Sequence, residues 1–327
     1  MSVTPTPIQT PVDSDAERLI VRGESKLETA SGKFRKATTS RGATLAALII
    51  AMIWTVPTLG LFISSFRPAN DIKTSGWWTV FTHPAFTLDN YTNALNSGDA
   101  LTLGKAFVNS LVITIPGALI PITIASLAAY AFAWINFRGR NTLFVLIFSL
   151  QIVPIQMALV PLLQLFSDGL RVGSLYVLPG LGVNGVEGSY AKVWIAHTIF
   201  ALPLAIFMLH NFISEIPGEV IEAARMDGAG HGQIFFRVVL PLAVPAIASF
   251  GIFQFLWVWN DLLVATVFTS GGGLPITKAL QNLTGSYGQS WELLTAGAFL
   301  SIIVPLVVFF ALQRFFVRGL LAGATKG

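Results

Sequence analysis

The sequence contains no cysteine, and this absence excludes disulfide bonds, thiolate catalysis and metal sites built on cysteine. Histidine is also scarce. His83, His197, His210 and His231 are scattered along the chain rather than paired at the spacing of metal ligands. The sequence therefore predicts neither a thiol-based catalytic centre nor a metal site.

Charged residues are few as well, at 11% of the 327 residues, whereas a typical soluble domain carries about 25%. Hydrophobic residues make up 54% of the chain, and the mean hydropathy is +0.70. A chain with so little polar surface is expected in a lipid bilayer. The formal net charge of +4 is then assigned to positively charged cytoplasmic loops, and no nucleic-acid partner is expected.

Long apolar runs are what the sequence has in abundance. A helix needs about 20 apolar residues to cross the hydrocarbon, and only helices with satisfied backbones or closed barrels can do so. We therefore predict an all-α integral membrane protein with six transmembrane helices. The predicted spans are residues 43–65, 107–135, 141–166, 192–213, 241–269 and 292–317.

The distribution of Lys and Arg predicts the orientation of these spans. With the N-terminus inside, 14 of the 20 basic residues lie in the tails or inner connections, so both termini are expected in the cytoplasm. The first tail is expected to be disordered or, over Ala16–Thr29, a short helix on the membrane surface. The predicted parts are 1–42 (cytoplasmic tail), 43–66 (first transmembrane helix), 67–106 (extracytoplasmic loop), 107–317 (core with five transmembrane helices) and 318–327 (cytoplasmic tail).

The inner connection at residues 214–241 is too long and too patterned for a plain turn. Pro217 suits the beginning of a helix, and Gly228 with Gly230 suits its end. A second short helix is expected to run through Phe235 until Pro241 begins the next span. The pattern predicts a helix–turn–helix knob that projects into the cytoplasm and is joined to two spans.

This knob carries a motif. Glu222-Ala223-Ala224, then Gly228, then Leu240-Pro241 resemble the EAA loop of type I ABC importer permeases. In that family Gly follows Glu-Ala-Ala after three residues, and nine further residues separate it from an aliphatic residue, any residue and Leu-Pro. Val238 stands here where Ile is commonest. Shorter motifs resemble the carbohydrate branch, in the position of the maltose-permease G subunit; they are Phe86–Tyr91, Asn109-Ser110, Ala128–Phe132 and Trp259-Asn260-Asp261. Two further segments, Ser75–Phe81 and Phe255–Leu262, are most similar to its α-glucoside members.

The resemblance implies the type I ABC importer permease fold and a place in the bacterial cytoplasmic (inner) membrane. The chain would be the permease subunit of an ATP-driven, binding-protein-dependent importer for an α-glucoside such as maltose or trehalose. Its partners would be a second homologous permease, two ATPase subunits and an extracytoplasmic sugar-binding protein. The implied ATPase-coupling residues are Glu222, Ala223, Ala224, Asp227, Gly228 and Pro241. For a single glutamate, the alternative is an ordinary solvated helix charge.

No phosphate-binding loop of the form Gly-x-x-x-x-Gly-Lys-Ser/Thr occurs in the sequence. The glycine run that begins at Gly271 precedes Lys278 at the wrong spacing. We therefore expect the chain to be non-catalytic and to bind no cofactor itself. ATP and Mg²⁺ would bind to the partner ATPase subunits.

Polar residues in the fifth predicted span are candidates for a sugar pathway. Gln254, Trp257 and Asp261 fall at positions i, i+3 and i+7 of the expected helix, with Asn260 beside them. A carboxylate at membrane depth is costly, so Asp261 is expected to face protein or water. The alternative is that Asn260 and Asp261 bond to the backbone of kinked helices.

Other polar residues of the spans have a simpler reading, since His197, Gln151 and Gln156 are expected to link helices. Two other functions stay open. One is ABC import of a different small solute. The other is ion-coupled secondary transport, which would require several intramembrane carboxylates, and Asp261 is nearly alone.

Overall fold

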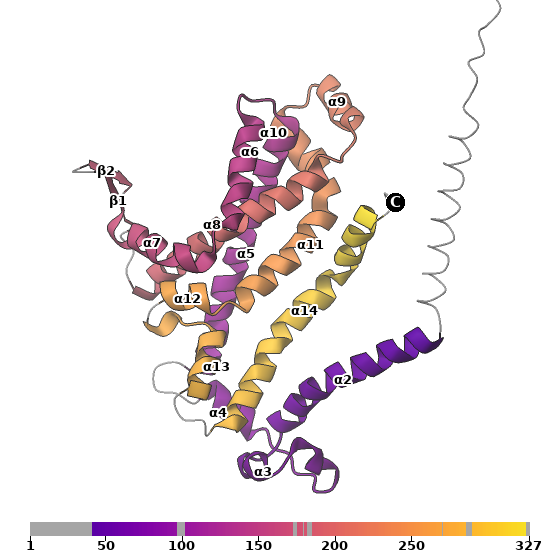
Figure 1. Cartoon of the computed structure of the whole chain (residues 1–327), viewed down its shortest axis with the longest axis vertical. Helices are drawn as coiled ribbons and strands as arrows, with labels where there is room; N and C mark the ends of the chain where they lie inside the picture. The colour runs from indigo at the N-terminus through magenta and orange to yellow at the C-terminus, as the bar shows by residue number, and fades with distance from the viewer. Residues whose placement is uncertain are drawn as a thin grey trace, which may run out of the picture. The chain divides into compact units, whose positions relative to one another are not determined.

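The computed structural model describes residues 41–96, 102–172, 175–178, 180–181, 185–269, 271–285 and 290–324. The chain divides into two compact units at Gly60/Leu61. The first unit contains most of α2 (Arg41–Ser65), whose apolar sequence includes Pro57. The predicted tail at 1–42 lies almost entirely outside the described residues. The second unit contains all the other elements (Figure 1).

The elements of the second unit are almost all helices. They are α3 (Ala69–Thr74), η1 (Trp77–Phe81), α4 (Asp89–Asn96), α5 (Leu103–Trp134), α6 (Arg140–Ser149), η2 (Leu150–Ile152), α7 (Ile155–Asp168), α8 (Gly185–Ile213), α9 (Gly218–Met226), α10 (His231–Ile234), η3 (Phe235–Val239), α11 (Leu240–Trp259), α12 (Leu263–Phe268), η4 (Gly271–Gly273), α13 (Ile276–Gly285) and α14 (Trp291–Ala324). One small antiparallel hairpin, β1 (Leu170–Val172) and β2 (Leu175–Leu178), was not predicted. It joins α7 to α8 and leaves the all-α class unchanged.

Six apolar segments of the described residues have the length and composition of membrane spans. Five are single helices, and the sixth is a bent pair. The fold prediction of six spans holds when this pair counts as one. An even number of spans places both termini on the same side, as the distribution of Lys and Arg requires. The single helices cover Gly42–Ser65, Leu103–Trp134, Tyr190–Ile213, His231–Trp259 and Trp291–Gln313.

The third predicted span, 141–166, is not one helix. Arg140–Ile152 and Ile155–Asp168 meet at an angle of 105°. Val153 is extended, with ψ of 119°, because the Pro154 ring disfavours helical geometry in the residue before it. Pro161, further along, stays inside α7.

The fifth predicted span, 241–269, is shifted toward the N-terminus. Its helix begins at His231 and ends at Trp259, and α12 is a separate short helix. Pro241 therefore lies within a continuous helix instead of beginning it. The turn before it, η3, is a π-helix in which the Leu240 N–H reaches back five residues to the Phe235 carbonyl. This wide turn accommodates a proline that lacks a donor and crowds the preceding turn.

The last helix is longer than predicted: α14 continues past residue 317 to Ala324.

Prolines in the spans leave backbone carbonyls without their helical donors, and side chains from other helices supply three of the missing hydrogen bonds. A proline removes the N–H that would bond the carbonyl four residues earlier. In α5 the carbonyl opposite Pro116 belongs to Val112, and it accepts from Trp194 Nε1 at 2.9 Å. The carbonyl opposite Pro121 belongs to Gly117, and it accepts from Gln254 Nε2 at 3.1 Å.

The third case lies in α14. The carbonyl opposite Pro305 belongs to Ser301, and it accepts from Trp259 Nε1 at 3.0 Å. An unsatisfied backbone carbonyl is expensive in hydrocarbon, so these bonds are what make prolines tolerable there. They also tie α5 to α8 and α11, and α11 to α14.

At the outer ends of the spans, the predicted extracytoplasmic loop is organised around a buried arginine. Arg67 is only 3% exposed, and its guanidinium donates to the carbonyls of Ser75 and Asp71. Asn90 of α4 donates to the carbonyls of Ser65 and Arg67. The loop is therefore a folded piece rather than a plain connector, and α4 packs against α14.

Candidate functional site

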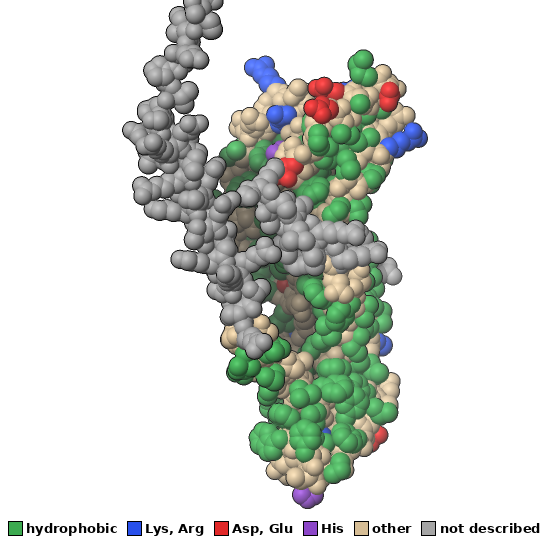
Figure 2. Space-filling view, turned by 90° about the vertical axis from the view of Figure 1, so that its right-hand side faces the viewer, with side chains coloured by type: hydrophobic (Ala, Val, Ile, Leu, Met, Phe, Trp, Pro, Cys, Tyr) green, Lys and Arg blue, Asp and Glu red, His purple; other side chains and the backbone are tan. Residues whose placement is uncertain are grey.

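The predicted knob is present and is formed by α9, the turn at Gly228 and α10. It lies at one end of the second unit, beyond the ends of α5 and α8 (Figure 1). In the space-filling view, acidic and basic side chains gather at this end and hydrophobic side chains cover much of the length below it (Figure 2). This separation of charge from apolar surface fits an aqueous end next to a membrane-spanning body.

Local sequence chemistry sets the bounds of the first helix. α9 begins directly after Pro217, as predicted, and Glu219 occupies its first turn near the positive end of the helix dipole. It ends in a Schellman motif, with the Ala229 N–H bonded to the Ala224 carbonyl at 3.0 Å. Gly228 has φ of +79°, the left-handed conformation that this motif requires and that glycine adopts without strain.

One face of the knob is anchored in the protein core. Ile221 is 1% exposed and packs in a cluster with Ile213 and Ile216, which precede α9. Ile234 and Phe235, which follow the turn, belong to the same cluster. Burying one such side chain is worth about 1.5–3 kcal/mol. The knob is therefore a fixed projection of the helical core rather than a loose loop.

The opposite face is exposed and carries the motif. The side chains of Glu222, Ala223 and Asp227 are exposed, and that of Met226 is 88% exposed. Among the residues that the structure describes, the Glu222 carboxylate has no hydrogen-bonding or ionic partner. Ala224 is partly buried against the core cluster. Three predicted coupling residues, Glu222, Ala223 and Asp227, thus share one open face, with Gly228 shaping its edge.

The assignment of Pro241 to the coupling surface stays a prediction. Pro241 lies in the first turn of α11, beyond the π-helical turn, and its role in the sequence pattern is explained by helix geometry.

Two residues of α5 bond to the knob, one through its side chain and one through its backbone carbonyl, and neither was predicted. The Tyr130 hydroxyl lies 2.9 Å from His231 Nδ1, on the far side of the turn. Arg225 Nη2, on the near side, donates to the Trp134 carbonyl at 3.1 Å. Trp134 Nε1 in turn donates to the Ile213 carbonyl at the end of α8. The Ala128–Phe132 motif marked this region in the sequence, but no local signal linked it to the knob.

The spacing placed Gln254, Trp257 and Asp261 on one helical face, but Asp261 does not lie on it. α11 ends at Trp259, so Asp261 is outside the helix on which the spacing argument depended. Asp261 instead accepts hydrogen bonds from the N–H groups of Val264 and Ala265, at 3.2 and 2.7 Å, and caps α12. Asn260 is exposed and donates to the Leu256 carbonyl of its own helix.

Of the other two pathway candidates, Gln254 is buried and Trp257 is partly buried. Gln254 is 4% exposed and bonds to the Gly117 carbonyl, so it is this residue, rather than Asn260 or Asp261, that bonds to a kinked neighbouring helix. Trp257 packs edge-on against His197, with ring centroids 5.2 Å apart. His197 Nε2 is 3.4 Å from the Asp261 carboxylate, so His197 connects α8 to the break after α11.

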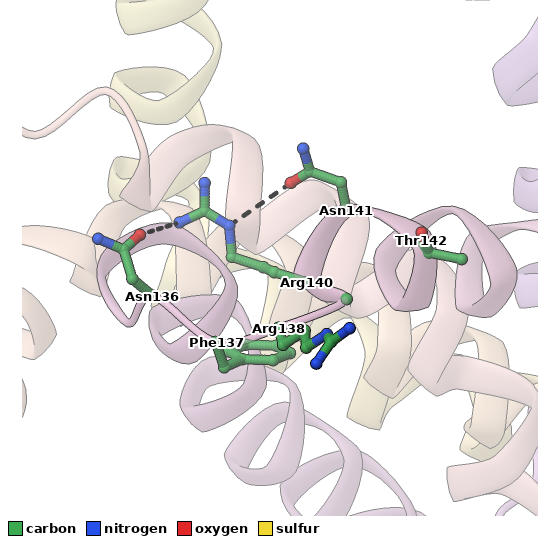
Figure 3. Close-up of a pocket in the computed structure, with 7 residues that line it drawn as sticks. Asn136, Phe137, Arg138, Arg140, Asn141 and Thr142 are labelled. Atoms are coloured by element: carbon green, nitrogen blue, oxygen red, sulfur yellow. Dashed lines mark hydrogen bonds between the residues drawn. The ribbon is translucent and has the colours of Figure 1, made fainter.

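Two depressions were not predicted. One, of about 190 Å³, lies at the bend before α7 and is lined by Gln151 and mainly apolar residues. The other, an open one of about 540 Å³, lies over the tight turn at residues 136–142 (Figure 3). There Arg140 bonds to Asn136 at 3.3 Å, and Gly139 adopts φ of +84°. This open turn lacks the enclosure of a small-molecule site.

Comparison with known proteins identifies the family. The model of the binding-protein-dependent transport system inner membrane component matches residues 121–321, which include the whole knob. The chain belongs to this family. It is accordingly a multi-pass protein of the inner membrane and the non-catalytic permease subunit of an ABC importer, in which ATP hydrolysis belongs to a separate subunit.

Curated relatives of this permease cover most of its length. It is 52% identical over 288 residues to the osmoprotective compounds uptake permease protein GgtD of Synechocystis sp., covering 86% of this chain and 91% of the relative. It is 49% identical over 271 residues to the alpha-glucoside transport system permease protein AglG of Rhizobium meliloti, covering 80% and 68%.

A solved structure supports the fold. A bacterial ABC transporter involved in import of the acidic polysaccharide alginate contains a chain that matches this permease with a TM-score of 0.63. The match covers 85% of this chain and 98% of the other at 20% sequence identity. The predicted type I importer permease fold is confirmed.

Proposed function

We propose that this permease imports an α-glucoside such as maltose or trehalose. It would act with a second homologous permease, an extracytoplasmic sugar-binding protein and two ATPase subunits that hold ATP and Mg²⁺. The observation that carries the coupling role is the open face of Glu222, Ala223 and Asp227 on a knob anchored by Ile221. Such a face suits docking into a groove of an ATPase subunit, with Glu222 opposite a basic residue.

The choice of solute rests on the relatives. The AglG protein of R. meliloti is named for α-glucosides, and the trehalose transport system permease protein SugB of Mycobacterium tuberculosis is 32% identical over 83% of this chain. The name of the Synechocystis relative supports a second candidate, an osmoprotective compound. Ion-coupled transport is set aside, because the family is ATP-driven.

The predicted pathway residues would have two roles, according to whether their side chains are already bonded within the protein. Asn260 and Trp257 would contact the solute, since the Asn260 side chain is exposed and Trp257 is only partly buried. Gln254 and Asp261 would hold the surrounding wall, since their side chains are bonded to backbone groups.

Glu222→Lys tests the coupling role. In a complex purified through this chain and reconstituted in vesicles, we expect the variant to lose ATPase subunits and ATP-driven uptake by at least tenfold. The physical reason is that lysine would oppose a basic partner in a close contact, where like charges cost several kcal/mol. Copurification of the ATPase and uptake of maltose, trehalose and sucrose, without an ion gradient, are measured.

Asp89→Lys provides the control, because it makes the same charge change at the outer end, on exposed α4 surface. It should leave both measurements unchanged. Wild-type copurification and uptake in the Glu222→Lys variant would show that the knob is not the docking point.

A further inference from the structure

The knob is part of the chain between α8 and α11, so movement of an attached ATPase reaches these two spans directly. α5 is not its chain neighbour. At its inner end, however, α5 contacts the knob on both sides of Gly228, through Tyr130 to His231 and through Trp134 to Arg225. The first contact uses the Tyr130 side chain, and the second uses the backbone carbonyl of Trp134, the last residue of α5.

The α5 side of the first contact is buried, whereas Arg225 and His231 are exposed. Tyr130 is 4% exposed, and its ring also packs edge-on against Phe235, with centroids 5.5 Å apart. The Arg225 bond is made to a carbonyl in the last turn of α5, where a cation complements the helix dipole. We call Tyr130, Trp134, Arg225 and His231 the inner clamp.

The outer end of α5 holds the connection that follows α12. Asn109 donates to the carbonyls of Gly272 and Leu274, at 2.6 and 2.9 Å. Ser110 accepts from the Ile276 N–H at 2.8 Å. The 32 residues of α5 span roughly 48 Å, more than the hydrocarbon thickness of about 30 Å, so one helix connects both sides of the membrane.

α5 is also bonded to its neighbours within the bundle. Its proline-exposed carbonyls accept hydrogen bonds from Trp194 of α8 and Gln254 of α11. These bonds favour motion of the three helices as one body over independent bending of α5.

We propose that the inner clamp passes ATPase movement into α5, and that α5 repositions the outer connection at residues 271–276 through Asn109 and Ser110. Tyr130 and His231 are thus positioning residues for transport. This inference rests on the proposed docking of the ATPase at the knob. It adds a specific route by which ATPase movement at the inner end changes the position of the outer connection.

The test measures amide hydrogen exchange of residues 271–285 in the complex purified through this chain, with and without ATP plus vanadate. We expect the wild-type exchange to change when the nucleotide is added. In Tyr130→Phe and in His231→Ala, the change should shrink about threefold to tenfold, the range given by loss of one neutral hydrogen bond. The double variant should resemble each single variant, because all three remove the same bond.

Tyr91→Phe is the matched control. It removes a hydroxyl that lies 2.7 Å from Ser65 Oγ in the outer loop, away from the clamp, and should leave the exchange change intact. A full wild-type response in Tyr130→Phe, or no nucleotide response of 271–285 in the wild-type complex, would overturn the proposed route. Retention of the ATPase in these variants, beside its loss in Glu222→Lys, separates failure of this route from failure of the docking role.

Discussion

The knob and the end of α11 both carry polar residues that were predicted to be functional, yet the surroundings of these residues differ. In the knob, Glu222 and Asp227 face outward, on a helix whose other face is buried. At the end of α11, Gln254 and Asp261 are occupied by backbone groups of the same chain. The difference separates residues available to a partner from residues that complete the fold.

Ile221→Asp is expected to lower folding stability most, because it places a carboxylate on the buried face of the knob. An unpaired carboxylate at a site that is 1% exposed should cost more than about 3 kcal/mol of folding stability. Monodisperse protein in detergent and its thermal unfolding temperature are the measurements.

Met226→Asp introduces the same side chain on the same helix at a site that is 88% exposed. It should leave the unfolding temperature within about a degree of wild type, since exposed substitutions usually stay within ±0.5 kcal/mol. Equal melting of the two variants would contradict the division of the knob into a buried and an open face.

Gln254→Leu tests the polar residues of α11, and its expected loss of folding stability is intermediate. It removes the donor that replaces the missing N–H of Pro121, leaving the Gly117 carbonyl unsatisfied at a cost of about 1–3 kcal/mol. The unfolding temperature should fall accordingly. Adding Pro121→Ala to Gln254→Leu should recover most of the loss, because alanine restores an N–H four residues after Gly117.

This rescue distinguishes the two roles of Gln254. A sugar-binding residue would lose apparent affinity for solute in both the single and the double variant, with no recovery of stability. If Pro121→Ala did not restore the unfolding temperature, Gln254 would not stabilise the fold by compensating for Pro121.

Of the three substitutions expected to destabilise the protein, Gly228→Ala should have the smallest effect. A side chain at φ of +79° costs about 1–2 kcal/mol, and no atom outside the local backbone lies within 4 Å to add a clash. Gly232→Ala is the matched control on the other side of the turn, with open space and no positive φ. A loss of stability in the control equal to that in Gly228→Ala would show that the turn conformation is not the cause.

Sequence reasoning succeeded where the determinants are local. Pro217 and Gly228 bound α9 as predicted, and the motif spacing identified the family. It failed where a distant residue decides the outcome. The prolines are visible in the sequence, but the side chains that compensate for them bond to carbonyls 82, 137 and 42 residues away. No local pattern reveals that Gln254 serves Pro121.

The expectation that Gln254, Trp257 and Asp261 share one helical face was wrong for a related reason. A spacing of i, i+3 and i+7 has meaning only if the helix continues, and α11 stops at Trp259 because Asn260 and Asp261 favour caps and turns. Similarly, Pro154 breaks a run whose apolar composition alone predicts one span.

The π-helical turn at Phe235–Val239 has a consequence for the phase of the helix that contains it. Its extra residue rotates everything from Leu240 onward by about 100° relative to an uninterrupted helix starting at His231. Deleting one residue of this turn would restore regular winding but direct the Trp259 indole and the Gln254 amide away from the carbonyls they serve. The number of residues in this turn therefore sets the direction in which Gln254 and Trp259 leave α11.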